Sequence, residues 1–147
     1  MATTFLSFLY PNTCVNCAKE LRQFEEYICL HCSNDLSPIK YCSNIDPIFQ
    51  LFWGKVNIEY ATACFNFIKG EKAQKIIHEF KYKGNKKLAL NTGINMGKLC
   101  KNNNNFSDID AITFVPSTKR KTRSRGYNQS LELCKGVSLE LKLPVVS

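Results

Sequence analysis

The chain has 147 residues, of which 44% are hydrophobic, and this composition excludes a disordered tail and indicates a globular protein. Twenty Lys and Arg against twelve Asp and Glu give a net charge of +8. We therefore expect an acidic partner, whether a polynucleotide, a phosphorylated sugar or a nucleotide.

The first eleven residues, MATTFLSFLYP, are apolar but too short to span a bilayer, which takes roughly 20 apolar residues. They lack a basic leading segment and a small-residue cleavage site, so we do not expect a signal peptide. A short helix packed on the next module is the expected structure. No membrane span is predicted elsewhere, and we expect a cytoplasmic location, where thiols stay reduced.

Two Cys-x-x-Cys pairs follow, separated by eleven residues, and this spacing is typical of a zinc knuckle or ribbon. Two disulfides are disfavoured in a reducing cytosol, and four unrelated thiols would not be spaced so regularly. A closed shell of four thiolates predicts structural rather than catalytic zinc. The other cysteines, Cys42, Cys64, Cys100 and Cys134, are expected to be small buried residues. The predicted metal ligands are Cys14, Cys17, Cys29 and Cys32.

We assign residues 1–40 to this zinc-binding ribbon, 41–57 to a connector and 58–147 to a larger domain. The connector holds Phe49, Phe52 and Trp53, which we expect to form a docking surface. The larger domain begins with a β-rich stretch, Tyr60–Ile68. Apolar residues at helical spacing then predict two helices, Ala73–Tyr82 and Leu88–Leu99.

A short apolar run, Asp110–Pro116, predicts a buried parallel strand. It leads into a basic loop that ends at Gly126, and then into a helix over Tyr127–Leu143 and a strand opening at Leu143. This order is a βαβ unit, in which the loop after the first strand holds phosphate groups. A solvated basic loop, or one with nonspecific nucleic-acid contacts, stays open as an alternative. The cations of the loop are Lys119, Arg120, Lys121, Arg123 and Arg125.

Five features of the sequence occur together in one order, namely the two Cys pairs, Phe52–Val56, His78–Asn85, Val115–Pro116 and Arg125–Gln129. Together they resemble the ComF family of phosphoribosyltransferase-like proteins, which have an N-terminal zinc-binding region and are linked in some bacteria to competence and DNA uptake. The resemblance spans essentially the whole chain.

The resemblance implies an α/β fold in which the zinc ribbon precedes the N-terminal part of a type I phosphoribosyltransferase-like domain, with an incomplete parallel sheet. Such domains bind phosphoribosyl pyrophosphate with Mg²⁺. The matching pyrophosphate-binding residues here would be Arg120, Arg123, Arg125, Gly126, Asn128 and Gln129.

The sequence departs from the family pattern after the second strand. Type I phosphoribosyltransferases have a later strand ending in an acidic pair, followed by a Thr- and Gly-rich loop around the ribose 5-phosphate, and the 147 residues contain neither. Only Cys42 stands where many members have a further Cys-x-x-Cys, so one metal rather than two is expected. We therefore expect the N-terminal part of a longer family member, which would need the missing segment or another chain and which alone would not turn over substrate.

Two functions remain from the sequence. One is a phosphoribosyltransferase-type protein that binds phosphoribosyl pyrophosphate or a nucleotide. The other is a noncatalytic protein that binds nucleic acid, including single-stranded DNA, during DNA uptake, through its zinc module and its clusters of lysine and arginine.

Overall fold

The computed structural model describes residues 12–36, 47–65 and 72–147. The helix predicted for the first eleven residues, Cys42 and the first part of the connector lie outside these ranges. The N-terminal module ends in helix α2 (Leu30–Asp35), and the described part of the connector begins with α3 (Pro47–Gln50) and continues in turns.

The two helices predicted in the larger domain are confirmed as α4 (Lys72–Tyr82) and α5 (Lys86–Lys101), with a short 3₁₀ helix η1 (Asn104–Phe106) after α5. Gly84 makes the sharp turn between α4 and α5 with a φ of 70°, which suits a residue without Cβ. Asn85 starts α5, because its side chain accepts a hydrogen bond from Leu88 N.

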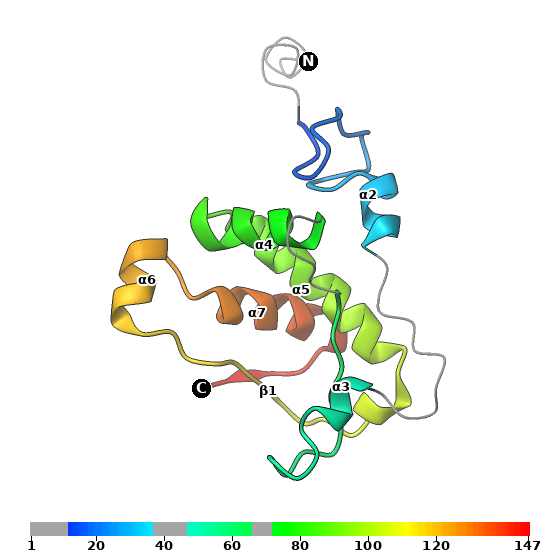
Figure 1. Ribbon diagram of the computed structural model, residues 1–147, viewed down its shortest axis with the longest axis vertical. Helices are drawn as coiled ribbons and strands as arrows, with labels where there is room; N and C mark the ends of the chain where they lie inside the picture. Colours follow the sequence, from blue (N-terminus) through cyan, green and yellow to red (C-terminus); the bar gives the residue numbers. More distant parts are fainter. Residues whose placement is uncertain (1–11, 37–46, 66–71) are drawn as a thin grey trace.

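The C-terminal region is the predicted βαβ unit (Figure 1). Strand β1 (Ile112–Thr113) pairs in parallel with β2 (Val145–Val146), and helix α7 (Gln129–Leu141) connects them. The chain is therefore mixed, mostly helical with one small parallel sheet in its described part. In the same part of the chain, no helix has the length and apolar character of a membrane span.

Two sequence expectations are wrong. Residues 60–65, the described part of the predicted β-rich stretch, form no strand. The basic loop is instead a short helix, α6 (Lys119–Arg125). Thr118 caps it by accepting a hydrogen bond from Lys121 N, and Gly126 ends it in the left-handed conformation with a φ of 77°.

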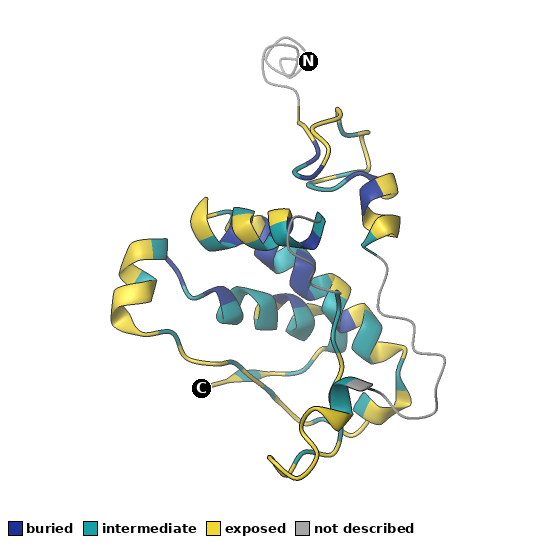
Figure 2. Ribbon diagram, in the orientation of Figure 1, coloured by how far each residue is buried: buried dark blue, intermediate teal, exposed yellow. Residues whose placement is uncertain are grey.

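The main hydrophobic core joins α4 and α5 to the segment that precedes α7, and Figure 2 shows the buried residues where α4 lies against α5. Its central members are Ile76, Phe80, Leu88, Ala89 and Tyr127. The N-terminal module packs against this cluster through partly buried side chains. These side chains are Val15, Tyr27, Ile28 and Leu36.

Helices α5 and α7 approach each other closely along a line of glycines. A Cβ on Gly93 would lie 3.0 Å from the Cα of Gly136, and a Cβ on Gly97 would lie 2.7 Å from the Cβ of Glu140. Such approach is possible only without side chains at these positions. Hydrogen bonds from Tyr127 and Gln129 to the carbonyl groups of Phe80 and Lys81 hold the start of α7 near the end of α4.

Candidate functional site

Four cysteine sulfurs of the N-terminal module lie within 4.8 Å of one another. The Sγ atoms of Cys17 and Cys29 are 3.7 Å apart. A zinc ion with four thiolates at about 2.3 Å has sulfur–sulfur edges of about 3.8 Å, so this arrangement fits a tetrahedral ion. The cluster of Cys14, Cys17, Cys29 and Cys32 could therefore hold a metal ion such as zinc.

The first Cys pair sits on a tight turn. Cys14 N donates to Lys19 O at 2.8 Å, and Ala18 N donates to Cys14 O at 2.8 Å. Ala18 has a φ of 59°, the left-handed conformation that costs a residue with a Cβ about 1–2 kcal/mol. The turn brings the sulfurs of Cys14 and Cys17 to the same side.

The second pair is positioned by α2. Cys29 is its N-cap residue and Cys32 lies in its first turn. Before the helix, the Glu25 carboxylate accepts hydrogen bonds of 2.7 Å from Arg22 N and from Leu30 N, which holds the approach to the helix. A helix start also favours negative charge, such as that of a thiolate.

The thiols differ in their ionisation. Burial alone would raise the pKa of Cys14, but hydrogen bonds from backbone N–H groups, first that of Cys29, lower the pKa to about 6. Cys29 N lies 3.4 Å from Cys14 Sγ. Burial and the neighbouring thiols raise the pKa of Cys32. The lowered pKa thus favours the thiolate form of Cys14, whereas Cys32 would have to lose its proton for a cation to bind there.

The remaining cysteines in the described ranges do not join this cluster. Cys64, Cys100 and Cys134 were expected to be buried, and each is half-buried. Burial raises the pKa of the Cys64 thiol to about 11. These three residues are therefore neutral thiols at physiological pH, which makes them poor nucleophiles and poor metal ligands.

A cleft of about 520 Å³ opens where the end of β1, α6 and the start of α7 meet α4. Its lining combines apolar residues, such as Phe80 and Leu133, with the cations Lys81, Lys121 and Arg125. We call it the basic cleft. Its remaining lining residues are Ile77, Val115, Pro116, Ser117, Asn128, Gln129 and Ser130.

The Arg125 side chain is held in place by a buried amide. Its Nη1 donates to Gln129 Oε1 at 2.9 Å, and Gln129 Nε2 donates to Lys81 O at 3.1 Å. Gln129 is only 8% exposed. The Arg125 guanidinium also lies 5.8 Å from the centre of the Tyr82 ring, within cation–π range. Arg125 is thus preorganised, with its other donors free of this network.

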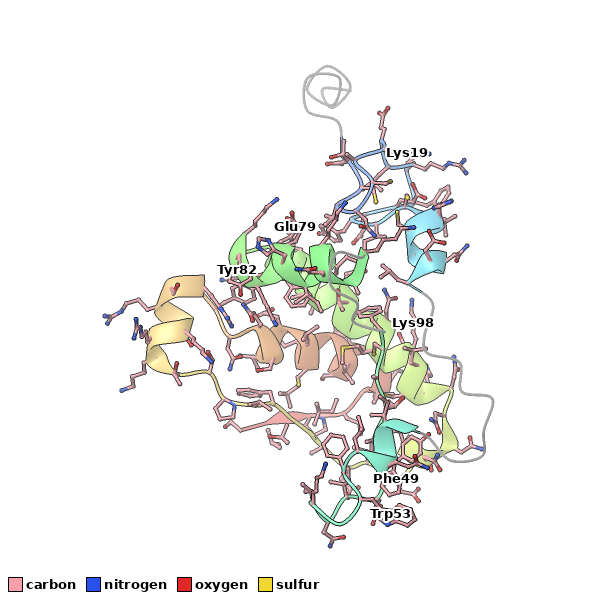
Figure 3. All side chains as sticks on the ribbon, viewed as in Figure 1. Lys19, Phe49, Trp53, Glu79, Tyr82 and Lys98 are labelled. Carbon is pink, nitrogen blue, oxygen red and sulfur yellow. The ribbon has the colours of Figure 1, made fainter. Side chains whose placement is uncertain are left out.

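A second hollow of about 440 Å³ adjoins the basic cleft and shares Lys81, Lys121 and Arg125 with it. Tyr82 lines this hollow, and Figure 3 shows it at the end of α4, on the side of α6. None of the described residues lining either hollow is Asp or Glu. The two hollows form one continuous cationic surface.

The start of α7 is anchored at the edge of the cleft. Asn128 caps the helix by accepting from Ser130 N at 3.1 Å. The Ser130 hydroxyl donates to Val115 O at 2.5 Å, which ties the helix start to the chain just after β1. The N-terminus of this 13-residue helix therefore opens toward the cations.

The structure brings only some of the predicted pyrophosphate residues together. Arg125, Asn128 and Gln129 line the basic cleft, and Arg120 lines the adjoining hollow. Arg123 lines neither. The backbone N–H of Gly126 donates to Thr122 O at 2.8 Å, so it serves the end of α6 rather than a ligand.

Sequence reasoning missed Lys81 and did not choose Lys121 from the basic cluster. Lys81 lies within the stretch His78–Asn85 that carried part of the ComF resemblance, and this was the available signal. The sequence does not tell which cations of α6 line the cleft, because this depends on which side of the short helix faces α4. Lys121 therefore could not be distinguished from its neighbours.

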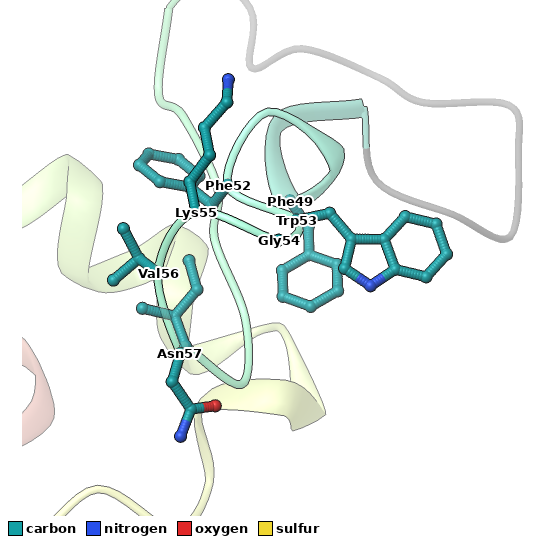
Figure 4. Close-up of a pocket in the computed structure, with 8 residues that line it drawn as sticks. Phe49, Phe52, Trp53, Gly54, Lys55, Val56 and Asn57 are labelled. Carbon is teal, nitrogen blue, oxygen red and sulfur yellow. The ribbon is translucent and has the colours of Figure 1, made fainter.

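A third hollow, of about 460 Å³, lies in the connector and contains the three predicted docking aromatics (Figure 4). Trp53 is 73% exposed, and Lys55 Nζ donates to Leu51 O at 3.1 Å. The docking surface itself stays a prediction. The hollow is lined by Phe49, Phe52, Trp53, Gly54, Lys55, Val56, Asn57 and Ile58.

Comparison of the chain with protein-family models, curated proteins and solved structures found no match. The site geometry and the sequence resemblance therefore carry the functional argument.

Proposed function

We propose that the chain binds a phosphorylated small molecule, phosphoribosyl pyrophosphate or a nucleotide, in the basic cleft, as a ComF-like protein of the phosphoribosyltransferase type. The observation that carries the proposal is the Arg125 side chain, fixed by buried Gln129 beside Lys81 and Lys121. No carboxylate among the lining residues competes for these cations.

The groups suit a diphosphate. Arg125 offers a planar fork that pairs bidentately with phosphate oxygens, whereas Lys81 and Lys121 act as point charges. The N-terminus of α7 adds its partial positive charge at the same edge. Mg²⁺ would arrive on the phosphate oxygens of the ligand, because the cleft has no carboxylate to hold it.

The metal at the four cysteines would be one structural zinc. Four thiolates close the coordination shell, which leaves no position for substrate. Among its described residues 12–36, the module has a buried cluster of Cys14, Cys29 and Cys32 with Leu21 and Ile28 packed against it, so the metal would supply much of its folding free energy.

We predict binding without turnover. The residues that line the cleft include no carboxylate or imidazole that could transfer a proton to or from an acceptor. Release of pyrophosphate by the purified chain would contradict this prediction.

Titration calorimetry with phosphoribosyl pyrophosphate and Mg²⁺ tests the proposal. Arg125→Ala should lower the affinity at least tenfold, which is about 1.4 kcal/mol. Arg123→Ala removes the same charge from the same helix outside the cleft and is the matched control. Absence of binding by the wild-type chain, or equal effects of the two variants, would contradict a site at this cleft.

Single-stranded nucleic acid is the second candidate, favoured by one observation. Tyr82 is 66% exposed beside α6, and no residue of α6 forms an ion pair within the described ranges. An exposed ring beside cations that no carboxylate neutralises suits base stacking along a charged backbone. Anisotropy of a labelled oligothymidine should then show affinity falling linearly with salt on logarithmic axes. Absence of binding at low salt would exclude this candidate.

A further inference from the structure

One helix, α4, contacts both the N-terminal module that contains the four cysteines and the basic cleft. The outer surface of α4 receives the N-terminal module, while the backbone at its C-terminal end supports the residues that shape the cleft. The two sites are therefore joined through a single rigid element.

On the metal side, the contacts come from residues between and beside the cysteines. Lys75 Nζ donates at 3.1 Å to the carbonyl oxygen of Asn16, which lies between Cys14 and Cys17. Lys72 forms an ion pair with Asp35 of α2. Val15 and Ile28 pack against the core cluster that contains Ile76 and Phe80. The position of the module thus depends on the turn that the four cysteines define.

On the cleft side, two consecutive carbonyl groups at the end of α4 hold the segment that carries the cations. The Tyr127 hydroxyl donates to Phe80 O, and Gln129 Nε2 donates to Lys81 O at 3.1 Å. Gln129 in turn fixes Arg125. A shift of the end of α4 would therefore move the Arg125 guanidinium.

We propose that metal binding at the four cysteines sets the affinity of the basic cleft through α4, with Gln129 as the positioning residue that transmits the change to Arg125. This inference rests on the proposed function. Without metal, the module loses its main source of folding free energy, since its own buried cluster is three cysteines. The side of α4 that it covers is then released, and Lys81 O is no longer held in register with Gln129.

The coupling free energy between zinc binding and ligand binding is reciprocal, so it can be measured from the effect of either one on the other. Zinc-loaded chain should bind phosphoribosyl pyrophosphate with Mg²⁺ at least fivefold more tightly than chain depleted of zinc by dialysis and returned to Mg²⁺ buffer. The ligand should likewise raise the affinity of the chain for zinc by the same factor, measured at equilibrium by competition with a chromogenic chelator. Circular dichroism on both forms shows whether the helices persist without zinc.

A variant with the metal retained separates coupling from unfolding. Lys75→Ala removes the hydrogen bond to Asn16 O but no metal ligand, and should lower ligand affinity twofold or more while zinc content stays unchanged. Lys98→Ala, an exposed lysine on α5 away from the cleft, is the matched control for the lost charge.

Gln129→Leu tests the route. If Gln129 transmits the effect, this variant should bind the ligand weakly, and zinc depletion should then change its affinity by less than twofold. Equal sensitivity of wild type and Gln129→Leu to zinc would overturn the role of Gln129.

The outcomes distinguish the two proposals. Failure of the zinc-loaded wild type to bind phosphoribosyl pyrophosphate contradicts the proposed function. Tight binding that is unchanged by zinc depletion, or equal affinities of Lys75→Ala and Lys98→Ala, contradicts the coupling and leaves the binding function standing.

Discussion

A Cβ on Gly136 would lie 2.7 Å from the carbonyl carbon of Gly93, so helices α7 and α5 touch backbone to backbone. The contact sets the distance between α7, whose first residues line the basic cleft, and α5. Stability and cleft geometry therefore depend on the absence of side chains at Gly93 and Gly136.

Gly136→Ala should destabilise the chain by about 1–3 kcal/mol, because overpacking of the helix interface outweighs the roughly 1 kcal/mol that alanine gains in helix propensity. Urea unfolding followed by circular dichroism measures the change. Asn95→Ala, at an exposed position of α5, is the control and should be neutral or slightly stabilising. A Gly136→Ala variant as stable as the control would mean that the helices lie farther apart.

Metal analysis should find about one zinc per chain, and Cys29→Ser should abolish stoichiometric binding, since it removes one of the four sulfur ligands while serine can still cap α2. Cys134→Ser changes a thiol outside the cluster and should keep the zinc. Full zinc content in Cys29→Ser, or loss of zinc in Cys134→Ser, would contradict the assigned ligands.

Arg125→Lys should weaken binding of phosphoribosyl pyrophosphate by about tenfold although the charge is retained, because a lysine has no planar fork to contact both Gln129 and a phosphate. Calorimetry on Arg125→Lys and Lys121→Arg makes the comparison. Lys121→Arg should bind comparably to wild type, since a point contact to phosphate tolerates either cation. An unaffected Arg125→Lys would show that charge alone matters.

Tyr127→Phe should destabilise the chain by about 1–2 kcal/mol, because it leaves the carbonyl of Phe80 without its buried donor. Tyr82→Phe removes a hydroxyl from a ring that is 66% exposed and should change stability little. Denaturant unfolding measures the stability of both variants. Equal free energies of unfolding would mean that the hydrogen bond from Tyr127 to Phe80 O does not stabilise the fold.

The stability gap between wild type and Tyr127→Phe should narrow at alkaline pH. Burial, with the nearby Glu132 charge, raises the pKa of Tyr127 above its usual value near 10. The pKa of Tyr127 is higher in the folded chain than in the unfolded chain. The stabilising contribution of its hydroxyl is therefore complete below pH 10 and is lost as pH rises through the folded-state pKa. Denaturant unfolding of both proteins between pH 8 and 11 measures this difference in stability. A constant difference would mean that the pKa of the hydroxyl is the same in the folded and unfolded chain.

The elements that sequence predicted best are those with a strong local pattern. Regular Cys spacing indicated the metal cluster, and apolar residues at helical spacing indicated α4, α5 and α7. The parallel pairing of β1 with β2 followed from the order of strand, helix and strand.

The basic segment was mistaken for a loop because its charge and Gly126 outweighed the N-cap signal of Thr118. The exact composition of the cleft could not be predicted either. Lys81 joins it through the fold, and Gln129 turns inward only because the end of α4 presents a carbonyl to it. These are tertiary contacts between segments far apart in the chain, which no local pattern encodes.

The left-handed Ala18 bears on how firmly the four-cysteine cluster would hold an ion. A glycine there would adopt the same turn without steric cost, so alanine forfeits about 1–2 kcal/mol of what metal binding would otherwise gain. That loss amounts to roughly a tenfold weaker hold on the ion. A zinc ion bound by these four cysteines would therefore dissociate at a higher free-zinc concentration than one held by the same cysteines around a glycine turn.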